Sequence, residues 1–163
     1  MCIRDRCVPS LKELLETAKR KTSLKLVLEL KAHSKPEREI KAVEEIVSMI
    51  KKMGLEPRMI YITFSSHALK ELIRQAPTST PVYYLKGDLS PQQLKELGSA
   101  GPDYHFSEFY RYTDWIESCH ALGLKVNVWT VNKKEDMQYF WDKVDFITTD
   151  EPLGLLKDIM KVK

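Results

Sequence analysis

Strand-like and helix-like segments alternate along almost the whole chain, and this alternation restricts the possible folds more strongly than composition does. Short runs rich in β-branched and aliphatic residues are each followed by a longer stretch with apolar residues at helical spacing. Strict alternation predicts a parallel sheet covered by its connecting helices. We therefore expect one α/β domain, built from one helix followed by six strand–helix units.

The boundaries of these elements follow from local signals. Six segments have the residue types and length of strands: 24–31, 59–64, 82–85, 104–107, 126–131 and 146–148. The expected helix-capping residues are Ser10, Ser34, Ser90 and Asn132. A long helix is expected over about 36–53, closed by Gly54, and a final helix after Pro152.

Two architectures fit this pattern, an open doubly wound sheet and a closed barrel. No G-x-G-x-x-G occurs, which disfavours the dinucleotide-binding form of the open sheet without excluding an open sheet. A complete barrel of eight strand–helix units needs about 250 residues, so this chain would be short by roughly 80 to 90. The expected fold is an incomplete (β/α) barrel with about six of the eight parallel units.

Composition is that of an ordinary soluble globular domain. The chain has 26 basic and 23 acidic residues and a net charge of +3, with the signs interleaved on the predicted helix faces. This pattern indicates a solvated surface and gives no reason to expect a nucleic-acid partner. No apolar run approaches the ~20 residues of a membrane span, and no signal-peptide core is visible. The sequence leaves the compartment open between the cytoplasm and the periplasm or secretion.

The strand at 24–31 carries charge on one face. Lys25, Val27, Glu29 and Lys31 alternate with leucines, so Glu29 and Lys31 lie on the same face near the C-terminal end. Active sites of parallel barrels lie at that end. A carboxylate there can bind a hard cation, and the ammonium can reach a phosphate oxygen. From periodicity alone, however, an ordinary solvated Glu/Lys pair is the favoured interpretation.

Two later segments end strands in polar or aromatic residues. Trp129 lies near the C-terminal end of its strand and could line a pocket, but core packing is favoured for a lone tryptophan. Asp150 follows the last strand, where capping of the final helix is favoured over a catalytic role.

Read together, these segments resemble the glycerophosphodiester phosphodiesterase family, in the family's order. The segments that carry the resemblance are Val-Pro-Ser-Leu at 8–11, Glu-Leu-Lys at 29–31, Thr-Phe-Ser at 63–65, His-Ala-Leu-Gly-Leu at 120–124, Val-Trp-Thr-Val-Asn at 128–132 and the closing strand at 144–152. The tryptophan stretch and the closing strand together are the more specific part. We interpret residues 1–6 as non-native, and residues 7–163 as part of the family's domain.

The resemblance implies a TIM barrel that hydrolyses a small-molecule glycerophosphodiester to an alcohol and glycerol 3-phosphate, using a divalent cation, Ca²⁺ or Mg²⁺. On the matching positions, Glu29 would be a metal ligand and Lys31 would contact the phosphate. Trp129 and Phe64 would line the substrate pocket.

The family's catalytic histidines and its other acidic metal ligands precede the matched region, so no catalytic residue is identified in this chain. His33 follows Lys31 closely, but the family has no catalytic histidine there, and His67, His105 and His120 are interpreted as surface or helix residues. The chain alone is therefore expected to be inactive. The alternatives are a catalytically silent barrel that binds a phosphorylated ligand or a protein partner, and an unrelated open α/β binding domain.

Overall fold

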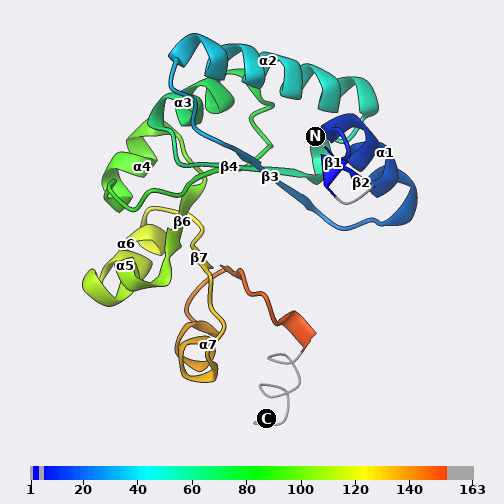
Figure 1. The fold of residues 1–163 in the computed structure, drawn as a ribbon. Helices are drawn as coiled ribbons and strands as arrows, with labels where there is room; N and C mark the ends of the chain where they lie inside the picture. The colour runs from blue at the N-terminus through cyan, green and yellow to red at the C-terminus, as the bar shows by residue number, and fades with distance from the viewer. Residues whose placement is uncertain (1, 4–5, 154–163) are drawn as a thin grey trace.

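A six-stranded parallel sheet forms the centre of the computed structural model, which describes residues 2–3 and 6–153 (Figure 1). Its strands are β3 (Leu26–Leu30), β4 (Met59–Thr63), β5 (Val82–Tyr84), β6 (Gly101–His105), β7 (Asn127–Trp129) and β8 (Phe146–Ile147). Their order in the sheet is their order in the sequence, and every neighbouring pair is parallel. The absence of any reversal among these strands excludes a doubly wound sheet. The sheet curls as part of a barrel does, which confirms the expected barrel-like fold (Figure 1).

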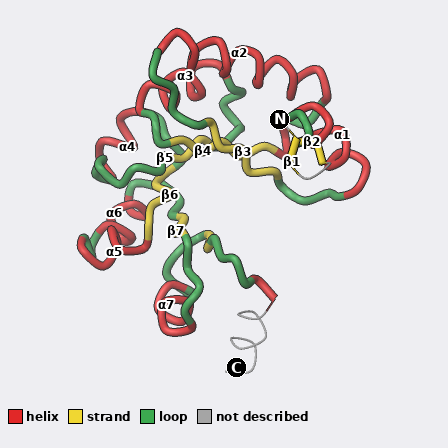
Figure 2. Tube along the Cα trace, viewed as in Figure 1, coloured by secondary structure: helices red, strands yellow, loops and turns green. Residues whose placement is uncertain are grey.

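Helices connect the strands and lie on the outer, convex side of the curled sheet (Figure 2). They are α1 (Leu11–Lys21), α2 (Pro36–Met53), α3 (Ser66–Gln75), α4 (Pro91–Leu97), α5 (Phe106–Arg111), α6 (Trp115–Ala121), α7 (Lys134–Phe140) and the short 3₁₀ turn η1 (Glu56–Arg58). The core fills the space between the sheet and these helices. Its largest fully buried side chains include Tyr61, Tyr84, Tyr104, Phe109 and Phe140. The described helices do not cover the concave side of the sheet.

Local capping explains several helix ends, and two predicted caps are wrong. Ser10 forms the expected capping box with Glu13. Ser90 starts its helix as expected and also forms a capping box, with Gln93. Gly54 closes α2 in the left-handed conformation, at φ +66°. Ser34 and Asn132 do not cap. The residues at those helix starts are Lys35 and Lys133, and neither side chain makes a capping hydrogen bond.

The largest boundary error concerns β6, which was expected over 104–107 and instead starts at Gly101. Gly101 has φ +147°, and a Cβ atom there would lie 1.9 Å from the carbonyl oxygen of Lys125. Only glycine permits this close approach of the two backbones. The segment after β6 also differs from expectation, because it contains two short helices, α5 and α6, instead of one.

The described residues at the two ends of the chain lie outside the six-stranded sheet. Residues 2–3 and 6–7 form a short antiparallel pair, β1 (Cys2–Ile3) with β2 (Arg6–Cys7), where no strand was expected. Of the final helix expected after Pro152, all but the first two residues fall outside the described part of the chain. No helix within the described residues is long and apolar enough to cross a membrane.

We expect the isolated 163-residue chain to self-associate. Within the described residues, β3 pairs only with β4 and β8 only with β7, which leaves two open sheet edges. Val27 on β3 is 60% exposed. Unpaired backbone groups beside exposed apolar side chains promote association between chains. Sedimentation velocity should show oligomers that diminish in Val27→Lys, whereas the control Leu24→Lys, which lies before the strand, should behave as wild type. A monomer that unfolds cooperatively would contradict this expectation.

Candidate functional site

The C-terminal ends of the strands bring polar and aromatic side chains together on the concave face. Residues that pair in register between parallel strands point to the same face. Glu29 pairs with Ile62, which pairs with Tyr83. Tyr83 pairs with Gly101, and Asp103 follows Gly101 by two residues, so it shares that face. The concave face therefore carries two carboxylates contributed by strands that are distant in sequence.

Glu29 and Lys31 form an ion pair at the end of β3. Lys31 Nζ lies 2.7 Å from Glu29 Oε1. The expected strand included Lys31, but β3 ends at Leu30, so Lys31 lies just beyond the observed strand. The two side chains differ in exposure, at 77% for Lys31 and 27% for Glu29. Glu29 Oε1 is a buried atom, and apart from this ion-pair contact it makes no hydrogen bond to the described residues.

Trp129 and Phe64 come together at the mouth of the half-barrel, although their strands are not neighbours. Their ring centroids are 5.8 Å apart in an edge-to-face arrangement. The indole Nε1–H of Trp129 donates to the carbonyl oxygen of Asp103 over 2.7 Å, which fixes the ring. Trp129 is half-buried and Phe64 exposed, so both line an open surface.

Asp103 is a buried carboxyl group that the sequence did not point to. It is 2% exposed, and its Oδ1 has no hydrogen-bond partner in the described structure. Burial raises the pKa of Asp103 to about 7; the Asn127 amide opposes this rise and the charge of Glu29 adds to it. In the sequence Asp103 follows Gly101 and Pro102, residues that disfavour strands. The expected strand therefore began three residues too late and did not include Asp103.

A second buried carboxylate, Glu39, ties together two loops beside the site. Its oxygens accept hydrogen bonds from the backbone N–H of His33 (3.0 Å) and the hydroxyl of Ser65 (2.8 Å), and His67 Nδ1 lies 3.1 Å away. Burial alone would raise the pKa of Glu39, but these contacts hold it below its ordinary value. The loops held in this way follow Lys31 and Phe64, so Glu39 fixes their starting points.

Most of the other residues considered from the sequence lie on the surface or make structural contacts. The side chain of His33 is exposed, and His120 contacts Asp145 at 3.2 Å. Asp150 accepts from Asn132 Nδ2 over 2.7 Å, which joins the loops after β7 and β8. His105 is the exception. It is the last residue of β6, with its ring 5.1 Å from that of Trp129, and is thus neither a helix residue nor a fully exposed one.

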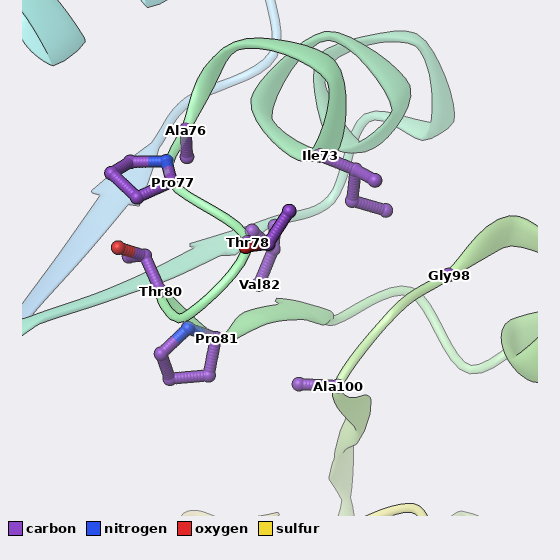
Figure 3. Close-up of a pocket in the computed structure, with 9 residues that line it drawn as sticks. All are labelled: Ile73, Ala76, Pro77, Thr78, Thr80, Pro81, Val82, Gly98 and Ala100. Atoms are coloured by element: carbon purple, nitrogen blue, oxygen red, sulfur yellow. The ribbon is translucent and has the colours of Figure 1, made fainter.

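One hollow lies far from these residues, at the opposite end of the strands. Its volume is about 220 Å³, and it is lined by Ile73, Val82 and Ala100 among others (Figure 3). Val82 begins β5 and Ala100 immediately precedes β6, so the hollow lies at the N-terminal edge of the sheet. The candidate site is therefore the C-terminal edge, where the polar and aromatic groups gather.

Comparisons with known proteins agree on one family. A family model described as the glycerophosphoryl diester phosphodiesterase family matches residues 2–153. A glycerophosphodiester phosphodiesterase of Caldanaerobacter subterraneus subsp. tengcongensis is 30% identical over 123 residues, which cover 72% of this chain and 49% of that protein. The chain thus spans about half the length of that curated relative.

Solved structures show the same likeness. A glycerophosphodiester phosphodiesterase from Parabacteroides distasonis superposes with a TM-score of 0.90 and 42% identity over 94% of this chain and 65% of that chain. An Oleispira antarctica phosphodiesterase, solved in complex with the product sn-glycerol-3-phosphate, shares the fold with a TM-score of 0.73 and 22% identity, over 93% of this chain and 61% of that one.

Proposed function

Because the chain belongs to the glycerophosphoryl diester phosphodiesterase family, we propose that it supplies the phosphate-binding part of an enzyme that hydrolyses glycerophosphodiesters to an alcohol and glycerol 3-phosphate. The observation that carries this proposal is the Glu29–Lys31 pair at the end of β3, at the same edge of the sheet as the Trp129–Phe64 contact. A charged pair beside an aromatic surface suits a ligand that is anionic at one end and carbon-rich at the other.

Each residue has a proposed role. Lys31, whose ammonium is well exposed, binds a phosphoryl oxygen and offsets the charge that develops on it. Trp129 and Phe64 pack against the carbon atoms of the substrate and exclude water from one side of the phosphate. Glu29 holds Lys31 in place through their ion pair, and its carboxylate binds a cation.

The described residues fit a divalent cation only in part. Glu29 supplies one oxygen of the hard type that Ca²⁺ and Mg²⁺ prefer, whereas such ions need six or more. No group of three or more metal-binding side chains is present in the part of the chain that the structure describes. We therefore propose that the other metal ligands and the catalytic histidines come from the part of the family's domain that precedes the matched region. When bound, the cation would stabilise negative charge on the phosphate.

The proposal is tested by completing the barrel. The part of the Parabacteroides distasonis relative that precedes its match to this chain is fused ahead of residues 8–163. We expect this fusion to release glycerol 3-phosphate from glycerophosphocholine with Mg²⁺ or Ca²⁺, and residues 1–163 alone to release none. An inactive but folded fusion that still binds glycerol 3-phosphate would favour the catalytically silent alternative. Turnover by residues 1–163 that His33→Ala abolishes would show instead that the chain is self-sufficient.

A further inference from the structure

His105 ends β6 at the same edge of the sheet as the proposed phosphate site. It pairs in register with Trp129 on β7, so both side chains point to the concave face. The two rings meet edge to face, with centroids 5.1 Å apart, and the ring of Phe106 covers another side of the imidazole at 4.4 Å. The side chain is half-buried and has a fixed direction.

Hydrogen bonds to Ser107 determine which nitrogen of His105 carries the proton in the neutral ring. The backbone N–H of Ser107 donates to Nδ1 over 3.3 Å, and the Ser107 hydroxyl lies 2.7 Å from the same atom. A backbone N–H can only donate, so Nδ1 is the acceptor and the hydrogen lies on Nε2. No hydrogen bond reaches Nε2 from any residue that the structure describes. The ring therefore presents a free N–H donor.

The rings of Phe64, Trp129 and His105 form a continuous row, which we call the aromatic wall. One end of the wall is close to the phosphate site, because Phe64 follows Thr63, and Thr63 pairs with Leu30 at the end of β3. His105 lies at the other end. A phosphate bound at Lys31 would place the carbon atoms attached to it along the wall, and polar groups further along those carbons near His105.

We propose that His105 is a specificity-determining residue that donates from Nε2–H to a hydroxyl group of the glycerol moiety. This inference rests on the proposed function, because it requires the phosphate to bind at Lys31. The donor lets the site distinguish glycerol phosphate from a phosphate ester of a plain alkyl chain. A site that hydrogen-bonds a substrate hydroxyl disfavours the analogue without one, since its own donor is then left unpaired.

The test measures binding of glycerol 3-phosphate and of n-propyl phosphate to the barrel-completing fusion by isothermal titration calorimetry. Wild type should bind glycerol 3-phosphate about three- to tenfold more tightly, the amount expected of one neutral hydrogen bond. His105 is the N-cap residue of α5, where its Nδ1 accepts from the Ser107 N–H. His105→Asn places a carbonyl oxygen near the position of Nδ1 and removes Nε2, so it should keep this cap but lose the preference. His105→Gln reaches the position of Nε2 with an amide N–H and should keep part of it.

Each outcome decides a separate point. If His105→Asn keeps the wild-type preference, or weakens binding of both ligands equally, the proposed role of His105 is wrong. Loss of the preference with unchanged affinity for propyl phosphate would establish it. A wild-type fusion that discriminates between the ligands but hydrolyses no glycerophosphodiester would leave this role standing and refute the proposed hydrolysis. Failure of wild type to bind either ligand would refute both.

Discussion

Replacing Glu29 by glutamine in the barrel-completing fusion should remove most of its turnover, by on the order of a hundredfold or more. Glutamine keeps the size of the side chain and removes its charge, so the fold is preserved while the affinity for a cation falls. The same substitution also releases Lys31 from its ion partner. The effect should appear as weaker dependence on Mg²⁺ or Ca²⁺ together with a lower turnover number on glycerophosphocholine.

A matched control exists on the outer surface. Glu45 forms an ion pair with Lys41 on α2, at 3.9 Å, and both side chains are exposed. Glu45→Gln removes the same charge from the same kind of pair, far from the C-terminal edge of the sheet. Turnover and metal dependence should stay as in wild type. If Glu29→Gln behaves like Glu45→Gln, the pair at Glu29 is an ordinary solvated one and the metal assignment is wrong.

Lys31→Ala should lower the turnover number and the specificity constant together, by on the order of a hundredfold. The reason is that the ammonium offsets charge that develops on the phosphate in the transition state, an interaction that is stronger there than in the ground state. Lys31→Arg should restore activity only in part, because the planar guanidinium does not reproduce a compact ammonium. Steady-state kinetics of the fusion measure both values.

Lys41→Ala is the control for this variant, since Lys41 and Lys31 have the same side-chain exposure, 77%. A loss of activity caused only by a general change in net charge would appear in both variants. An increase in KM alone in Lys31→Ala would indicate uniform substrate binding and contradict the transition-state role. Wild-type kinetics in Lys31→Ala would remove the residue from the site.

Patterns that depend on near neighbours in the chain could be read from the sequence. The bounds of α2 and the shared face of Glu29 and Lys31 follow from helical or strand periodicity, and the cap at Ser10 follows from its spacing to Glu13. The parallel, sequential sheet also followed, because alternating strands and helices have few ways to bury their apolar faces. The family's motifs added an expected role for Phe64, which periodicity alone would not have indicated.

Contacts between distant strands were decided only by the tertiary structure. β6 begins Gly-Pro-Asp, residues that disfavour strands, and it forms because the backbone on either side holds it: Ala100 N–H donates to Val82, and Lys125 N–H to Ala100, both over 2.9 Å. That pairing sets the register that buries Asp103 and brings His105 to the mouth of the half-barrel beside Trp129. The curl of the sheet then brings Trp129 against Phe64 across two intervening strands. Sequence periodicity predicts which face of the sheet a side chain occupies, whereas the curvature of the sheet determines which side chains on that face are in contact.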